Sequence, residues 1–115
     1  MLKVNIEKAT LENEYYRKVL DTTKQTQLVL MSLLPTEDIP EEKHKNTTQF
    51  IRVEQGTGVA VVNNKRFNLK DGDILVIPEN TKHYIKATGN KPFKLYSLYS
   101  PPEHPVGLIH KRQPM

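Results

Sequence analysis

The sequence predicts an all-β fold, either an antiparallel barrel or a sandwich, from three observations. From about residue 14 onward, short runs rich in β-branched and aromatic residues recur at close intervals. Turn-forming residues separate these runs, and no stretch keeps a helical period over a useful length. Many short strands without a long helix are typical of two packed antiparallel sheets or a closed barrel.

The predicted strands are short and closely spaced. In chain order they cover residues 14–21, 25–34, 49–53, 58–62, 65–69, 74–77, 83–88 and 93–99. Residues 22–24 suit a tight connection between the first two strands. Gln55–Gly58 form a hairpin signal, and Asn63-Asn64 tolerate the left-handed conformation that a two-residue turn requires. Residues 3–18 contain helix-favouring side chains but also Asn and Thr, so this segment stays undecided.

Proline and glycine mark the remaining boundaries. Residues 35–45 are polar and contain two prolines, so we expect a loop that leads into the next strand. Asp71–Asp73 and Gly89-Asn90 are further turn signals, and Pro78–Asn80 ends the sixth strand. Pro101-Pro102 stops the last strand, because proline cannot donate a ladder hydrogen bond.

Composition narrows the class of protein. The chain has 115 residues, 37% of them hydrophobic and 26% charged, which suits one soluble globular domain. The net charge is +4, but the 13 acidic residues are spread among the 17 basic ones, so we expect no nucleic-acid partner. Met1–Lys8 has no apolar core of a signal peptide, and no stretch approaches the roughly 18 apolar residues of a membrane span. We therefore expect a cytoplasmic protein without a membrane partner.

The candidate metal ligands lie in two separate stretches. The chain has no cysteine, which leaves histidine and carboxylate as the strong ligands. Glu42 and His44 alternate around one residue, so on an extended backbone both point to the same face. Gln49 opens the following strand, and His83 comes after the turn that begins at Pro78.

The spacing of these residues resembles the two conserved motifs of the cupin superfamily. One segment reads His44-x4-Gln49-x6-Gly56, and another reads Gly72-x5-Pro78-x4-His83. The usual cupin forms are Gly-x5-His-x-His-x(3,4)-Glu-x6-Gly and Gly-x5-Pro-x-Gly-x2-His-x3-Asn. The resemblance covers residues 35–88, with five departures from the usual motifs: Thr36, Glu42, Gln49, Asn80 and Ala87. The usual motif has its one glutamate at the position of Gln49 and a histidine at the position of Glu42. This sequence has its one carboxylate at position 42 instead, so the charge of the ligand set is the same.

Further segments look like small single-domain cupins that are often labelled mannose-6-phosphate-isomerase-like, a branch in which the Glu-x-His, Gln and His set recurs. The segments are Leu28–Leu33, Gln49–Arg52 and Leu95–Pro105. The resemblance implies a single cupin domain over residues 1–115, folded as a jelly-roll β-barrel. Its metal motifs lie within residues 36–87, and residues 101–115 form a C-terminal tail.

The resemblance implies a divalent metal held by Glu42, His44, Gln49 and His83. Two imidazoles and one carboxylate suit Fe(II) and are compatible with Mn, Ni, Co or Zn, and the Gln carbonyl is a weaker fourth ligand. We expect a metal-dependent enzyme that acts on a small polar metabolite, either as a sugar or keto isomerase or as an Fe(II) oxygenase. Glu42 is also a possible general base. The alternatives are a cupin that binds or senses a small molecule without turnover, and a purely structural barrel.

Other side chains carry weaker expectations. Tyr96 and Tyr99 have opposite parity on the last strand, so at most one faces the interior, where Tyr99 is a candidate for hydrogen bonding to substrate or for acid catalysis. Arg52 falls on the outer face. For His104 and His110 in the tail, a surface role is favoured over closing a pocket mouth.

Spare apolar residues predict a partner. Phe50, Val59, Val61 and the N-terminal strand supply more apolar side chains than the interior of one small barrel can use. A two-fold homodimer is the simplest way to cover them.

Overall fold

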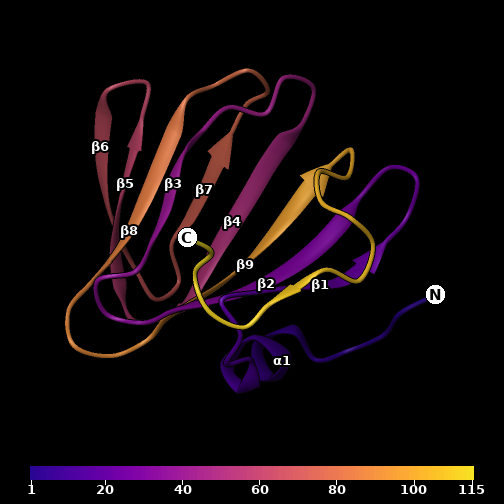
Figure 1. The fold of residues 1–115 in the computed structure, drawn as a ribbon, viewed down its shortest axis with the longest axis horizontal. Coiled ribbons are helices and arrows are strands. Elements are labelled where there is room, and N and C mark those ends of the chain that lie inside the picture. The colour runs from indigo at the N-terminus through magenta and orange to yellow at the C-terminus, as the bar shows by residue number, and fades with distance from the viewer.

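Ten short strands form two antiparallel sheets that face each other, and one helix precedes the first strand (Figure 1). The computed structural model describes all of residues 1–115. The elements are α1 (Ile6–Glu12), β1 (Arg17–Thr22), β2 (Gln27–Leu33), β3 (Asp38–Glu42), β4 (Thr48–Gln55), β5 (Thr57–Val62), β6 (Lys65–Lys70), β7 (Ile74–Ile77), β8 (His83–Thr88), β9 (Phe93–Ser100) and β10 (Ile109–His110). The predicted all-β jelly roll is confirmed, and no helix is long and apolar enough to cross a membrane.

The two sheets enclose one apolar core. The larger sheet has the strand order β10-β1-β2-β9-β4-β7, and the smaller has the order β3-β8-β5-β6. Val29 and Leu95 of the larger sheet and Ala60 and Ile85 of the smaller one are all fully buried and belong to the same cluster. Side chains alternate between core and outer face along each strand, as on β8, where every second residue from His83 is buried.

Two predicted turn positions have the backbone that their residue types favour. Asn63 and Asn64 have φ of 48° and 67°, and they connect β5 to β6 in a two-residue hairpin. Gly56, the last residue of the first motif, has φ of 85°. A Cβ atom at this position would lie 2.8 Å from the carbonyl oxygen of Pro92, so the close approach of two backbones also requires glycine.

The loop predicted over residues 35–45 was wrong, because this segment contains β3. Strand β3 pairs only with β8, at the edge of the smaller sheet. An edge strand tolerates Pro40, since the missing amide hydrogen would face away from the partner strand. Ile39 anchors the strand, because its side chain is buried in the core. The pairing register shifts between Ile39 and Glu42. The residues in this irregular stretch are polar, so the sequence alone did not indicate a strand there.

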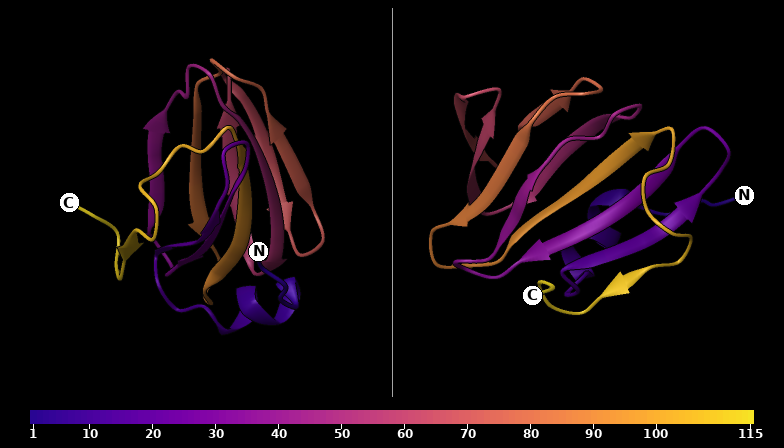
Figure 2. Two further views of the ribbon diagram at one scale, coloured as in Figure 1. Left: turned by 90° about the vertical axis from the view of Figure 1, so that its right-hand side faces the viewer. Right: turned by 45° about the horizontal axis from the view of Figure 1, so that its top comes forward.

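The chain termini pack onto the sheets. Helix α1 begins after Asn5, whose side chain accepts a hydrogen bond from the backbone of Lys8 at 2.9 Å. The C-terminal tail runs beside β1 through β10 and reaches β3, where Gln113 Nε2 donates to a carboxylate oxygen of Asp38 at 2.7 Å (Figure 2). The tail therefore connects the edge of the larger sheet to the edge of the smaller one.

Candidate metal centre

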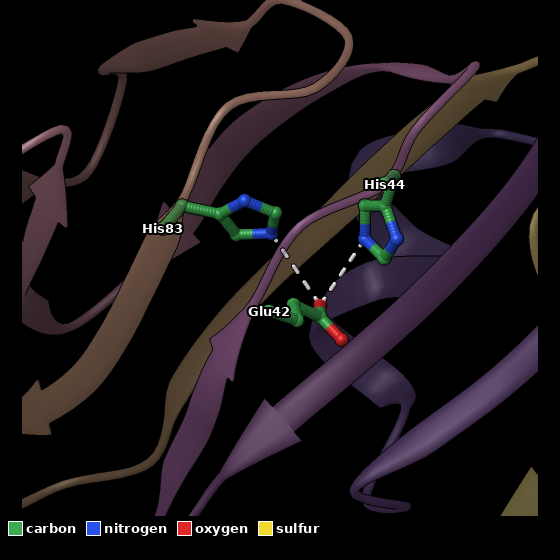
Figure 3. A group of neighbouring side chains, drawn as sticks. All are labelled: Glu42, His44 and His83. Atoms are coloured by element: carbon green, nitrogen blue, oxygen red, sulfur yellow. Dashed lines mark ion pairs between the residues drawn. The ribbon is translucent and has the colours of Figure 1, made fainter.

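Three of the predicted ligands meet at the junction of β3 and β8. Glu42 is the register partner of His83, and directly opposed residues of an antiparallel pair have their side chains on the same face. His44 follows two residues after Glu42 and returns to that face. Figure 3 shows the two imidazole rings on either side of the Glu42 carboxylate.

The ligand atoms of this trio are close together. Glu42 Oε1 lies 3.2 Å from His44 Nε2 and 3.4 Å from His83 Nε2, and the potential ligand atoms of the three residues all lie within 4.8 Å of one another. His83 is 1% exposed and His44 is 8% exposed. The Glu42 side chain is 29% exposed, so the cluster is largely buried and open to solvent at the carboxylate. It has the geometry and ligand types of a site that could hold a metal ion.

Gln49 approaches from the larger sheet. It is buried on β4 opposite Tyr99 of β9. Its Nε2 donates to Ser97 Oγ and to Tyr99 Oη, each at 3.1 Å. The Tyr99 ring meets the His44 ring edge-on at a centroid distance of 5.7 Å, which places this amide at the same end of the barrel as the trio.

Each predicted ligand has one metal-coordinating atom, an oxygen or a nitrogen, that has no hydrogen-bond partner within the protein. These atoms are Glu42 Oε1, His44 Nε2, Gln49 Oε1 and His83 Nε2, and all four are buried. Buried polar atoms are nearly always paired, so four unpaired ones at one end of a barrel require an explanation. A divalent cation accepts electron pairs from all four atom types, so the residues present fit such an ion.

Neighbouring groups determine which nitrogen of each histidine is free. His83 Nδ1 lies 3.0 Å from the carbonyl oxygen of Thr81, and His44 Nδ1 lies 3.3 Å from Glu103 Oε1. Each acceptor favours a proton on Nδ1 and leaves the lone pair on Nε2. Histidines that bind metals are usually held in this way by a carbonyl or a carboxylate.

The charges in the cluster shift its pKa values in opposite directions. Burial opposes ionisation of Glu42, but the adjacent imidazoles of His44 and His83 outweigh it and hold the Glu42 pKa well below its usual range. Burial likewise works against protonation of His44, but the adjacent carboxylate of Glu42, 3.2 Å away, outweighs it and raises the His44 pKa. Glu42 is therefore ionised at neutral pH.

The segment after β9 packs against this centre, and His104, which is partly exposed, lies there beside Tyr99. The ring of His104 stacks edge-on against Tyr99 at a centroid distance of 5.0 Å. Gln27 fixes the segment: its Oε1 accepts from the backbone amides of Glu103 and His104, and its Nε2 donates to the carbonyl of His104 at 2.7 Å. We call residues 101–105 the strap.

The remaining predicted positions divide by strand parity. Tyr99 is buried inside the barrel, whereas Tyr96 points to the opposite face and is partly exposed. Arg52 lies on the outer face, 3.6 Å from Glu54. His110 is partly exposed on β10, where its Nδ1 lies 3.0 Å from Arg17 Nη1.

Sequence reasoning missed Glu103 and Arg17. Glu103 belongs to no spacing motif, and only the path of the strap brings it to His44. Arg17 is 8% exposed and opposite Met31, on the inner face of β1. Arg17 is two residues before the apolar Val19, and residues two apart on a strand point to the same face. This spacing was the signal in the sequence that Arg17 points inward.

Comparison with known proteins identifies the family. The family model for the cupin domain matches residues 29–99. The chain belongs to the cupin family. This confirms the family resemblance of the two motifs, whereas the isomerase-like branch stays a prediction.

Several relatives of this cupin match nearly its whole length. Protein L612 of Acanthamoeba polyphaga mimivirus is 45% identical over 115 residues, covering 96% of this chain and 72% of L612. YrkC of Bacillus subtilis is 44% identical, covering 94% of this chain and 61% of YrkC, so the cupin spans about three-fifths of that protein. The crystal structure of BH2720 from Bacillus halodurans superposes with a TM-score of 0.94 at 38% identity and covers 96% of this chain and 89% of BH2720.

Proposed function

We propose that this cupin binds one divalent cation through Glu42, His44, Gln49 and His83. The observation that carries the proposal is the convergence of Glu42, His44 and His83, whose ligand atoms lie within 4.8 Å of one another. Gln49 Oε1 adds a buried oxygen without a hydrogen-bond partner at the same end of the barrel. The set of two imidazoles, one carboxylate and one amide oxygen suits Fe(II), Mn, Ni, Co or Zn. The carbonyl of Thr81 and the carboxylate of Glu103 support the two imidazoles from behind.

We infer that the protein is a metal-dependent enzyme acting on a small polar metabolite, as an isomerase or an oxygenase. A cation bound there would supply a Lewis acid for a carbonyl or hydroxyl oxygen of the substrate. Glu42 is ionised and lies between the two histidines, which suits a ligand better than a general base whose pKa is near neutrality. Burial raises the pKa of Tyr99 far above its usual range, so its hydroxyl stays protonated. That hydroxyl accepts from Gln49, and in the proposed enzyme it would donate its own hydrogen to a substrate oxygen.

One observation favours the alternative, a cupin that binds or senses a small molecule without turnover. The strap packs against the centre, and the four hollows in the molecular surface are all lined by other residues. A screen of small sugars, keto acids and hydroxy acids against the metal-loaded protein separates the two functions. An enzyme yields product, whereas a binding protein yields only a rise in melting temperature.

Elemental analysis of natively purified protein tests the metal proposal. We expect close to one transition-metal ion per chain in the wild type and in His110→Ala, which removes a histidine outside the centre. His83→Ala should lose the ion and retain the circular dichroism spectrum of the fold. Wild-type occupancy in folded His83→Ala, or no metal in the wild type after incubation with each candidate ion, would contradict the proposal.

We also infer a two-fold homodimer, as the spare apolar residues suggested. Ile74 and Val76 are 55% and 53% exposed on β7, which forms an edge of the larger sheet. Phe50 is paired with Val76 on the neighbouring strand. An apolar edge strand of this kind is suited to pairing with a second copy of the chain.

A further inference from the structure

Gln27 is a buried amide on the inner face of the larger sheet. It is fully buried at the start of β2, directly opposite Tyr99 of β9. Gln49 of β4 is the register partner of Tyr99 on the other side. Opposed residues of an antiparallel pair have their side chains on the same face, so Gln27, Tyr99 and Gln49 form one polar row across three neighbouring strands. The row brings Gln27 to the end of the barrel that carries the proposed metal centre.

The hydrogen bonds of this amide go mainly to the strap. Gln27 Nε2 donates to Thr22 Oγ1 at 3.0 Å and to the carbonyl oxygen of His104 at 2.7 Å. Its Oε1 accepts from the backbone amides of Glu103 at 3.1 Å and of His104 at 2.9 Å. A glutamine side chain offers two donor hydrogens and two acceptor positions, so its hydrogen-bonding capacity is fully used. Three of the four bonds hold a segment that pairs with no strand.

The strap in turn contacts the centre at two points. Glu103 Oε1 lies 3.3 Å from His44 Nδ1, and the ring of His104 meets the Tyr99 ring edge-on at 5.0 Å. The Glu103 side chain is 34% exposed, so little packing fixes its position. Holding its backbone lowers the entropy that the carboxylate must lose to stay at the imidazole. The contact with His44 therefore depends on what restrains the strap.

We propose that Gln27 is a positioning residue for the metal centre and acts through the strap. The inference rests on the proposed function, because the property that Gln27 controls is the affinity for that cation. Gln27 fixes the backbone of Glu103, and the Glu103 carboxylate fixes the tautomer and orientation of His44. The centre thus depends on a residue of β2 that touches none of the proposed ligands by a hydrogen bond.

The Kd for Zn²⁺, measured on the full chain by competition with a chromogenic chelator, tests this role. Gln27→Met removes all four hydrogen bonds with little change in side-chain volume. We expect it to raise the Kd about 10-fold, and by no more than Glu103→Ala does. Thr22→Val is the matched control, because it removes only the bond of Gln27 that does not reach the strap. Its Kd should equal that of the wild type.

Combining Gln27→Met with Glu103→Ala separates positioning from a purely structural role. If Gln27 acts through Glu103, the double variant should bind Zn²⁺ within about twofold of Glu103→Ala alone. A structural role would lower the melting temperature and leave the Kd of the folded protein unchanged. A wild-type Kd in folded Gln27→Met would overturn the proposal, as would the same fold-change with and without the Glu103 carboxylate.

Gln27→Glu keeps the test decisive if Gln27→Met does not fold. It has the same length and keeps an oxygen for the two strap amides, so its Kd should lie between those of the wild type and Glu103→Ala, and it replaces Gln27→Met in the double variant. If the wild type binds Zn²⁺ and no substitution of Gln27 alters the Kd, the positioning role fails and the metal centre stands. If the wild type binds no metal, the proposed function fails, and the positioning role fails with it.

Discussion

At the residue scale, the centre depends on groups that touch its histidines from behind. The Glu103 carboxylate lies against His44 Nδ1, and the Thr81 carbonyl lies against His83 Nδ1. The Thr81 group is a backbone carbonyl, which a substitution does not remove. The Glu103 group is a side chain, so a substitution can remove it. Its distance from His44 makes Glu103 a positioning residue for the proposed ligand.

Removing the Glu103 carboxylate should weaken metal binding without removing a ligand. We expect Glu103→Ala to raise the metal Kd by roughly 10- to 100-fold, because His44 loses the acceptor that fixes its tautomer and ring orientation. Competition with a chromogenic chelator measures the change. Glu41→Ala, at an exposed carboxylate nearby, is the control. An unchanged Kd for Glu103→Ala would show that the strap has no part in the centre.

The pKa of His44 should set the pH dependence of the proposed metal binding. Because this pKa is raised above 6.5, protons compete with the cation at higher pH than an ordinary histidine allows. In the metal-free protein, protonation of His44 has the opposite effect: it stabilises the fold instead of opposing metal binding. The raised pKa means that protonated His44 stabilises the fold below pH 6.5, and this contribution is lost as the pH rises through the folded value.

Metal should therefore increase the melting temperature more as the pH rises from about 6 to about 8. Glu42 does not contribute to this change, since its lowered pKa keeps it ionised throughout the range. Calorimetry of metal-loaded and chelator-stripped protein across this range measures the difference. A difference that is constant with pH, or that shrinks as the pH rises, would contradict the assignment of His44.

At the element scale, the turns were predictable and β3 was not. Two turns could be predicted from residue type, at Asn63-Asn64 and at Gly56. All three residues have a positive φ, which few other residue types adopt readily. Strand β3 carries Pro40 and mostly polar residues, so its local sequence favours a loop. Pairing with β8 and the burial of Ile39 outweigh that preference, and both depend on residues distant in the sequence.

Gly56 provides the prediction at this scale. We expect Gly56→Ala to lower the free energy of unfolding by roughly 1–3 kcal/mol, because the added Cβ combines a positive φ with a clash against Pro92. Gly107→Ala is the control, since Gly107 has a φ of 72° but no neighbouring atom within 4 Å. Urea denaturation measures both. Equal losses would show that the approach to Pro92 costs nothing.

At the scale of the whole molecule, the positions of the proposed ligands were predictable but their surroundings were not. Glu42, His44, Gln49 and His83 occur at motif spacing, and two paired strands bring the first and last together. Glu103 reaches His44, and His104 reaches Tyr99, only through the course of the strap. No periodicity or spacing in the sequence records that course.

The homodimer is tested at the exposed edge of the larger sheet. We expect light scattering to give twice the chain mass of 13.3 kDa for the wild type. Val76→Lys should shift the population to monomers, because it places a charge on the apolar edge strand. Val106→Lys, at an exposed valine in the tail, should remain dimeric. A monomeric wild type would contradict the interface.

Anomalous diffraction from crystals of the metal-loaded protein tests most directly whether two distant stretches of the chain hold one cation. The account predicts a single peak at bonding distance, roughly 2.0–2.3 Å, from Glu42 Oε1, His44 Nε2, Gln49 Oε1 and His83 Nε2. A peak elsewhere, such as at His110, with none between His44 and His83, would contradict it.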